Sequence, residues 1–479
     1  MRNLHKIILA AVVLSVVSSV STDAKVRLPH AISDGMIIQQ ECEANLWGWA
    51  EKGKTIKVSV SWSKERYTAQ TDDEGKFILK VKTPKASFTP QTITFNDGEK
   101  VTVKDVLVGD IWVCGGQSNM GMPIAGYDDC PVEDYNSAVA DAVNSKGVRY
   151  LKVPPKMSIT PLDDAPCEWR ICSPATVRYS DAIPYFFGRL LYQALDIPIG
   201  LIQANMGATR VESWISEENL KKYTDEDLSE DAINAIKPEE VRPMVWGNGT
   251  YWPVKNYTAR GIIWYQGESN IWYATEDYPR RLGIMVDQWR KGYGRGEEVP
   301  FYYVEIAPYS YDDSDGTRAA HMREIQFNAM EVIPNSHMIC TNDCMYDWEE
   351  NQIHPSQKRK VGERLAFVAL NKTYGMKDII CEGPRFREMK ISGDTVRVYL
   401  DNEFGGLYRS ENLVGFEVAG ADKVFHKASA NRFFRECIEI TCPEVKEPVA
   451  VRYCYKNFQL GNVANLAGLP LYPFRTDNW

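Results

Sequence analysis

The middle of the chain alternates short apolar, strand-like runs with longer stretches of helical periodicity. Five runs share the strand-like pattern: residues 106–114, 197–205, 259–267, 299–307 and 336–343. Four stretches between or after them share the helical pattern: residues 184–195, 277–289, 319–332 and 357–370. Buried strands that alternate with helices form a parallel sheet covered on both faces. The pattern therefore predicts an α/β domain built on one parallel sheet over residues 106–375.

The regions on either side of this domain show short β patterns instead. Residues 25–105 alternate apolar and polar positions with a period of two, and turn signals such as "DDEGK" and "NDGEK" separate the runs. This is typical of a small antiparallel, sandwich-like domain. Residues 376–479 return to short strands and end in an aromatic, Pro-rich tail. A chain of 479 residues is too long for one ordinary core, and we expect three structural regions with these boundaries.

Residues 1–24 combine two early basic residues with an apolar run and a small-residue ending, which is typical of a cleaved secretory signal peptide. The run is short for a membrane anchor. We therefore expect a secreted or periplasmic protein with no integral membrane span and leave its oligomeric state open. Eleven cysteines cannot all pair within one chain. Cys167 with Cys172, and Cys437 with Cys442, are either local disulfides or buried free thiols.

Charge and ligand spacing exclude several classes of partner. The formal net charge is −9, whereas a nucleic-acid or anionic-membrane partner requires a concentrated basic surface. The cysteines Cys340 and Cys344 have no partner pair that would complete a zinc site, and the carboxylates are scattered. We expect neither a metal nor a cofactor.

One serine follows the first strand of the predicted parallel sheet. Ser118 lies in "DIWVCGGQSNM", and the segments "ANMGATRVESW", "QGESN" and "NDCMYDWEENQIHP" follow three other strands. Ligands bind at the carboxyl ends of the strands in an open parallel sheet, so these four segments meet at one rim. A turn of Gly, Ser and Asn often carries no chemistry. Ser118 is thus a candidate nucleophile that requires a base and an oxyanion hole.

His354 is the candidate base, because it is the histidine in a loop that follows a strand. It precedes Pro355, which favours the first position of a helix, so we expect His354 near a helix N-cap. The alternative is a surface histidine that opens a helix. The backbone N–H of Ser118, the backbone of Gly207 and the side-chain amide of Gln266 are candidate oxyanion donors. Alternatively, Gly207 is a turn glycine and Gln266 a capping amide.

Seven segments together resemble one known family: "DGMIIQQ", "WGWAEKG", "DIWVCGGQSNM", "GATRVESW", "WYQGESN", "IHPSQKRKVGERLA" and "GLPLYPFRTDNW". They are similar to the sialate O-acetylesterases of the SGNH hydrolase superfamily, a group that overlaps with some acetylxylan esterases. The resemblance implies a flavodoxin-like, three-layer α/β domain with N-terminal and C-terminal β accessory regions. It also implies Ser118 as nucleophile, His354 as base and oxyanion donors at Ser118, Gly207 and Gln266, with no cofactor.

The chain departs from that family beside the histidine. Family members commonly have an aspartate two or three residues earlier, where this chain has Gln352 and Asn351. Another group must then orient the imidazole. Asp343, at the end of a strand, and Asp347 are the candidates, and a backbone carbonyl is an equal alternative.

A second departure is Arg210, in "GATR" where "GGT" and a small residue are usual. A guanidinium binds carboxylates in bidentate fashion, so Arg210 is a candidate partner for a substrate carboxylate, as in a sialic acid. The alternative is a salt bridge to Glu212 or Glu268. Three loop aromatic residues are candidates for a sugar platform or for ordinary packing: Trp252, Trp272 and Tyr273.

The candidate site residues predict acyl transfer, and the resemblance implies a carbohydrate O-acetylesterase that works through an acetyl-enzyme, with sialate esters as the leading substrates. The enzymatic alternative is an esterase for acetylated xylan or another plant glycan, with the same catalytic residues. A non-catalytic sugar-binding protein is the third alternative, and the missing aspartate favours it.

Overall fold

The computed structural model describes residues 25–273, 275–293, 296–434 and 436–479. The predicted signal peptide, residues 1–24, lies outside the described residues. Within them, no helix has the length and apolarity that crossing a membrane requires. All eleven cysteines belong to the described part of the chain, and the thiols of Cys167, Cys172, Cys437 and Cys442 are free. The pairs Cys167/Cys172 and Cys437/Cys442 therefore form no disulfide in the structure.

The centre of the molecule is a parallel sheet with the strand order β13-β12-β11-β7-β10-β8 and β9 antiparallel at the β8 edge. Its strands are β7 Lys100–Gly116, β8 Val148–Lys152, β9 Trp169–Ile171, β10 Ile199–Asn205, β11 Gly261–Tyr265, β12 Phe301–Val304 and β13 Ser336–Ile339. The long helices are α3 Ala182–Leu195, α6 Tyr278–Gly292, α7 Arg318–Val332 and α8 Lys358–Val368. The predicted α/β class, with a covered parallel sheet, is confirmed.

Alternate side chains of β7 point to the two helical layers. Trp112 packs in one core with α3 and α8, and its ring centroid lies 4.9 Å from that of Phe187. Val113 packs in the other core, which contains Trp289 of α6 and Met322 of α7. Every residue from 106 to 116 except Asp110 and the glycines is an apolar residue, and all are buried. A strand covered on both faces has to be apolar on both, which is why its sequence reads as a continuous run.

The strand β7 lies at the point where the strand order reverses. It pairs with β10 on one side and β11 on the other, and Gly116 is in register with both Asn205 and Tyr265. The chain leaves β7 for the β8 edge, returns through β10, and then crosses to β11. Such a switch point leaves a crevice at the carboxyl end of the central strand. The segment after Gly116 therefore faces the crevice.

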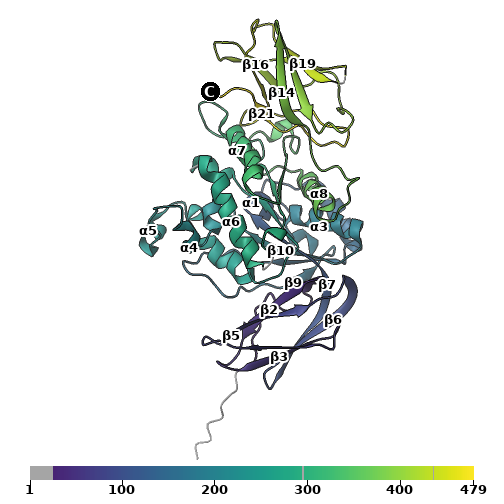
Figure 1. Ribbon diagram of the computed structural model, residues 1–479, viewed down its shortest axis with the longest axis vertical. Coiled ribbons are helices and arrows are strands. Elements are labelled where there is room, and N and C mark those ends of the chain that lie inside the picture. Colours follow the sequence, from purple (N-terminus) through teal and green to yellow (C-terminus); the bar gives the residue numbers. More distant parts are fainter. Residues whose placement is uncertain (1–24, 274, 294–295, 435) are drawn as a thin grey trace, which may run out of the picture.

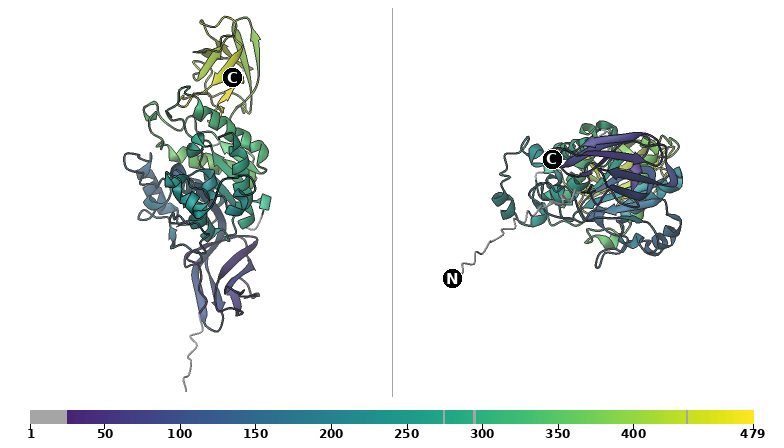
Figure 2. Two further views of the ribbon diagram at one scale, coloured as in Figure 1. Left: turned by 90° about the vertical axis from the view of Figure 1, so that its left-hand side faces the viewer. Right: turned by 90° about the horizontal axis from the view of Figure 1, so that it is seen from below.

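The β regions extend the molecule at both ends of the α/β unit (Figures 1 and 2). The N-terminal strands are β1 Ile37–Gln39, β2 Glu43–Trp49, β3 Thr55–Val60, β4 Arg66–Gln70, β5 Lys76–Lys82 and β6 Ser87–Asn96. The first half of β7 pairs with β6, so the predicted boundary between residues 105 and 106 falls inside one continuous strand.

The C-terminal region is built from two four-stranded sheets. One contains β14 Arg385–Ser392, β15 Thr395–Asp401, β18 Ser429–Phe433 and β19 Cys437–Thr441; the other contains β16 Phe416–Ala419, β17 Phe425–Lys427, β20 Ala450–Tyr453 and β21 Phe474–Arg475. The aromatic tail returns to the central sheet, where the hydroxyl of Tyr472 donates to the carbonyl of Met338 at 2.7 Å.

Candidate active site

Ser118 begins a single helical turn, α1 Ser118–Gly121, directly after β7. The two glycines before it are required by packing. A Cβ on Gly115 would lie 2.7 Å from the ring of Trp289, and Gly116 has a φ of +146° with the carbonyl oxygen of Tyr265 2.1 Å from a Cβ position. The chain can therefore turn sharply out of the sheet and place a half-buried Ser118 in the crevice.

Gly207 lies beside Ser118, in the loop that follows β10. A Cβ placed on Gly207 would be 3.4 Å from the Cβ of Ser118. The first N–H groups of a helical turn have no partner within the turn. Among the described residues, the N–H groups of Ser118 and Gly207 donate to no acceptor. Two backbone donors thus remain available next to the serine, as an oxyanion hole requires.

Contacts between neighbouring residues place His354 close to Ser118. The hydroxyl of Tyr127 donates to the carbonyl of Ser118 at 3.1 Å, and the ring centroids of Tyr127 and His354 are 5.2 Å apart. The side-chain amide of Asn119 donates to the carbonyl of Ile353 at 3.0 Å. The residues on either side of the two candidates are therefore in contact, although Ser118 and His354 are 236 positions apart in the chain.

Pro355 does not open the helix that follows His354. The helix α8 begins at Lys358, with Gln357 at its N-cap. His354 precedes a proline, and a residue in that position avoids the helical region of backbone conformation. Two residues later, the N–H of Ser356 donates to the carboxylate of Glu349 at 3.0 Å, outside any helix. His354 thus lies in an irregular loop, three residues before the cap.

The ring of His354 meets a thiol where the predicted site has a carboxylate. Its Nδ1 lies 3.7 Å from the Sγ of Cys130. The Oε1 of Gln352 accepts from the thiol of Cys130 at 3.3 Å and from the backbone N–H of His354 at 3.2 Å. Burial, with a further contribution from the ammonium of Lys358, lowers the pKa of His354 to about 4. The imidazole is therefore neutral, and able to accept a proton, at physiological pH.

The two aspartates predicted to orient the imidazole have other surroundings. Asp343 accepts from both Nη atoms of Arg364, at 2.6 and 2.7 Å, and from the Nζ of Lys360 at 3.3 Å. Burial raises the pKa of Asp343, but the two cations outweigh it and hold that pKa below its usual value. Asp347 is exposed at the start of a short turn. Within the described residues, neither aspartate makes a hydrogen bond or ion pair with His354.

Gln266, the predicted third oxyanion donor, is fully buried at the end of β11. Its Nε2 donates to the carbonyl of Thr209 at 2.9 Å and to the Oδ1 of Asn270 at 2.8 Å. Its Oε1 accepts from the hydroxyl of Tyr278 at 3.1 Å. The amide of Gln266 therefore fixes the loop that carries Gly207.

A hollow of about 240 Å³ opens beside Ser118 and contains residues that the sequence did not single out. The Nζ of Lys152 donates to the Oδ1 of buried Asp181 at 2.6 Å, and the Nδ2 of Asn205 donates to its Oδ2 at 2.8 Å. Burial is the largest effect on Asp181 and raises its pKa. The Oδ1 of Asn205 is buried and has no partner in the described part of the chain. Asn205 could have been found from the sequence, because it lies two residues before Gly207 at the carboxyl end of a predicted strand.

The four predicted substrate-binding residues do not line this hollow. The Nε of buried Arg210 donates to the carbonyl of Val241 at 2.7 Å, and its guanidinium lies 4.9 Å from the ring centroid of Tyr273. Trp252 lines a different hollow beside β2 and β5. Trp272 is exposed, with the guanidinium of Arg318 at 4.5 Å from its ring centroid.

The salt bridges considered for Arg210 are absent from the described residues. Glu212 is paired with Arg281, and Glu268 accepts from the side-chain amide of Asn119 at 2.6 Å. No group of three or more His, Cys, Asp or Glu side chains in the described ranges is arranged to hold a metal ion.

A serine at a switch point, with two free backbone donors beside it and a neutral imidazole nearby, is equipped for acyl transfer. A family model described as "Carbohydrate esterase, sialic acid-specific acetylesterase" matches residues 108–371. The chain belongs to this family. It is a carbohydrate O-acetylesterase, a carboxylic ester hydrolase, and the non-catalytic alternative is set aside.

Known carbohydrate esterases are similar to this chain over most of their length. The sialate O-acetylesterases of Homo sapiens and Pongo abelii are each 28% identical to this chain over 391 residues, which cover 75% of this chain and 73% of each relative. A solved structure of a carbohydrate acetylesterase from Xanthomonas citri is 29% identical, covers 95% of this chain and 100% of its own, and gives a TM-score of 0.83. The accessory β regions of this esterase are thus part of an arrangement found in another carbohydrate esterase.

Proposed function

We propose that Ser118 is the nucleophile and His354 the general base of an acetyl transfer to water. The Oγ of Ser118 attacks the acetyl carbonyl carbon, and its proton passes to His354. The N–H groups of Ser118 and Gly207 donate to the oxyanion that forms. The bond between the acetyl carbon and the sugar oxygen then breaks, and His354 returns the proton to that oxygen. Water repeats the sequence on the acetyl-enzyme and releases acetate.

The observation that carries this assignment is the contact between Gly207 and Ser118 at the end of the central strand. It supplies two donors, neither of which has an acceptor among the described residues, at the place where the tetrahedral intermediate would form. Gln266 supports the same hole as a positioning residue, because its amide holds the carbonyl of Thr209 and so fixes the loop of Gly207.

Cys130, Gln352 and Tyr127 position the imidazole in this proposal. The thiol and the amide oxygen contact the Nδ1 side and the backbone of His354, and the Tyr127 ring packs against the imidazole edge. None of these groups is a carboxylate, so they fix the ring without the stabilisation of its protonated form that an aspartate provides. In this scheme Asp343 and Asp347 do not orient the imidazole and take no part in the acetyl transfer.

O-acetylated sialic acids are the first substrates to test, because the family description and the names of the mammalian relatives both specify sialate. The hollow itself favours a second candidate, an O-acetylated neutral glycan. Among the described residues that line it, Lys152 is the one cation, and its Nζ is already paired with Asp181. Arg210, the predicted partner of a substrate carboxylate, lies outside the hollow.

We also propose that the protein is exported, with residues 1–24 as a cleaved signal peptide. The basic start and apolar run of that segment support export to the periplasm or the medium. O-acetylated sugars released outside the cell are then its substrates. The negative net charge supports the absence of nucleic-acid partners.

The test measures hydrolysis of p-nitrophenyl acetate and acetate release from O-acetylated sialic acid and O-acetylated xylo-oligosaccharides. Ser118→Ala and His354→Ala are expected to lower kcat by at least about 10³-fold on every ester, as in other serine hydrolases. Ser314→Ala and His426→Ala are matched controls, since both side chains lie outside the site, and they retain full activity. A Ser118→Ala enzyme with wild-type activity overturns the assignment. The preferred glycan decides between the two substrate classes.

A further inference from the structure

We propose that this esterase binds a chain of neutral sugars, and not only the acetylated one, along a groove that leads from Ser118 to the edge strand β9. This inference rests on the proposed function, because the groove can position a substrate for the reaction only if the acetyl group is cleaved at Ser118. The groove is made of three hollows that follow one another on the surface.

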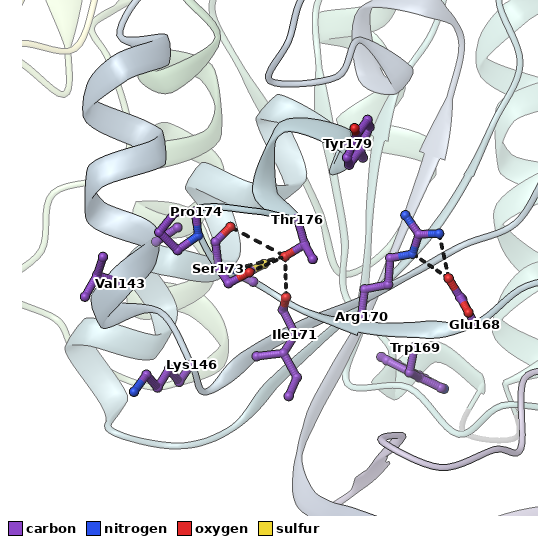
Figure 3. Close-up of a pocket in the computed structure, with 12 residues that line it drawn as sticks. Val143, Lys146, Glu168, Trp169, Arg170, Ile171, Ser173, Pro174, Thr176 and Tyr179 are labelled. Carbon is purple, nitrogen blue, oxygen red and sulfur yellow. Dashed lines mark hydrogen bonds and ion pairs between the residues drawn. The ribbon is translucent and has the colours of Figure 1, made fainter.

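The three hollows are joined by shared lining residues. The hollow beside Ser118 shares Lys152 and Pro155 with a second one of about 560 Å³. The second shares Glu168, Arg170 and Tyr179 with a third one of about 770 Å³. Figure 3 shows this outermost hollow, with Tyr179 and Arg170 among the side chains around it. The three hollows therefore adjoin one another, and a ligand that extends beyond the Ser118 hollow would enter the next one.

The size of the inner hollow requires such an exit. Pockets that enclose a drug-sized ligand have volumes of about 300–1,000 Å³, and the hollow beside Ser118 measures about 240 Å³. It suits an acetyl group and part of its sugar. The next sugars of an oligosaccharide then have to lie in the two larger hollows, which are within the usual range.

The lining of the outer hollows matches the mixed surface of a sugar chain. Tyr179 and Ile171 are 52% and 42% exposed, so two large apolar side chains face solvent beside polar groups. An aromatic face packs against the C–H groups of a sugar ring. Arg170 is paired with Glu168 at 2.6 Å, and both side chains remain partly exposed for hydroxyl groups to reach.

The balance of charge along the groove favours a neutral chain. Two of its cations are paired, Lys152 with buried Asp181 and Arg170 with Glu168. Lys146, in the outermost hollow, is the one further Lys or Arg among the described lining residues, so the groove has no strong excess of positive charge that would attract a polyanionic glycan. The wall of the middle hollow is rigid, because it contains three prolines: Pro154, Pro155 and Pro166. A rigid wall loses little conformational entropy when a ligand binds.

The experiment compares kcat/KM for O-acetylated neutral oligosaccharides of increasing length, each divided by kcat/KM for p-nitrophenyl acetate. For the wild type this ratio is expected to rise with length. Tyr179→Ala lowers the ratio for the longest substrate roughly tenfold, the scale of one aromatic stacking contact. Tyr179→Phe, which keeps the ring, restores it. Tyr408→Ala, a change at a tyrosine that is 77% exposed on the C-terminal region, is the matched control and keeps the wild-type ratio.

A second measurement separates the groove from catalysis. The Ser118→Ala enzyme is titrated with an unacetylated neutral oligosaccharide, with and without Tyr179→Ala, and the second change is expected to weaken binding roughly tenfold. A ratio independent of length, or of Tyr179, overturns the groove while acetate release still supports the esterase. Loss of every esterase activity in the wild type overturns the proposed function instead.

Discussion

The Nδ1 of His354 lies 3.7 Å from the Sγ of Cys130. In a Ser-His-Asp triad, a carboxylate occupies this position, holds the tautomer and stabilises the imidazolium that forms during acyl transfer. The thiol here is engaged by the Oε1 of Gln352 at 3.3 Å. This pair of residues orients the ring in place of a carboxylate. Without a carboxylate to oppose them, burial and, as a smaller effect, the ammonium of Lys358 lower the pKa of His354 to about 4.

The first prediction concerns the acidic limb of the pH profile. A general base works in its neutral form, so a depressed pKa extends activity toward acid. We expect kcat/KM for p-nitrophenyl acetate to be constant down to about pH 5 and to fall below it, with a midpoint near the pKa of about 4. Rates measured in overlapping buffers, within the pH range where the fold persists, provide the check. A midpoint at 6.5, the ordinary value for histidine, would contradict it.

The second prediction restores a carboxylate at position 352, two residues before the histidine. Gln352→Glu changes one atom and keeps the acceptor for the backbone N–H of His354. A negative charge near the imidazole favours its protonated form and raises its pKa, by roughly one unit or more. The acidic limb of kcat/KM is therefore expected to move to higher pH.

Asn351→Asp is the control for this change, because the side chain of Asn351 is exposed and a charge there is screened by solvent. The acidic limb of that variant stays at the wild-type position. Equal shifts in both variants would show that the general charge of the loop, and not the contact with His354, sets the pKa.

The third prediction assigns Asp343 to stability. Arg364 is 4% exposed and loses a bidentate partner in Asp343→Asn. Removing one member of a buried ion pair destabilises a protein by about 3–5 kcal/mol. Because the asparagine amide can still accept one hydrogen bond from Arg364, we expect the free energy of unfolding to fall by about 3 kcal/mol, the low end of that range. Urea unfolding at pH 7 measures the change. The acidic limb of kcat/KM is expected to remain where it is in the wild type.

The pH dependence of this contribution has a definite sign. The pKa of Asp343 is lower in the folded state than its ordinary value of 3.8, so the pair stabilises the fold above that value. The stabilisation is lost as the pH falls through the folded-state pKa. Asp347→Asn, a change of an exposed carboxylate, serves as the control with no loss of stability. A displaced acidic limb in Asp343→Asn without loss of stability would place Asp343 in the catalytic machinery.

The sheet could be predicted from the sequence because each of its strands is covered on both faces. Its residues then have to be apolar in unbroken runs, and such runs are visible without a structure. The rim on which Ser118 and His354 lie follows from the same pattern, since parallel strands end on one side. The boundary between the N-terminal β region and the α/β domain was not predictable. Val103 and Val113 belong to one strand, β7, which pairs with β6 in its first half and with β11 in its second half.

The partners of the catalytic candidates were beyond sequence reasoning for a different reason. Cys130 reaches His354 from a loop 224 positions away, and the network of Lys152, Asp181 and Asn205 joins two strands and the start of a helix. These contacts depend on how loops fold back over the sheet edge, which no periodicity records. The direction of the Gln266 amide, toward Thr209, is likewise set by tertiary packing.

The fourth prediction tests the oxyanion hole through Gly207→Ala. The φ of Gly207 is outside the left-handed region, so alanine fits its backbone, and the new methyl would lie 3.4 Å from the Cβ of Ser118. We expect that methyl to intrude on the space beside Ser118 in which the acetyl oxygen would be bound. We expect kcat to fall about 10²-fold, the scale of losing one oxyanion donor, while the thermal unfolding temperature stays within about 2 °C of the wild type.

The matched control for this change is Gly283→Ala on α6, where a Cβ meets only a side-chain carbon of Ile333 at 3.7 Å. It keeps full activity and, as a helix-interior glycine replaced by alanine, is slightly more stable. If Gly207→Ala also retains full kcat, the space beside Ser118 does not hold the acetyl oxygen, and the assignment of Gly207 as an oxyanion donor is overturned. If kcat falls but KM for p-nitrophenyl acetate is unchanged, the methyl acts on the transition state, as a group inside the oxyanion hole must.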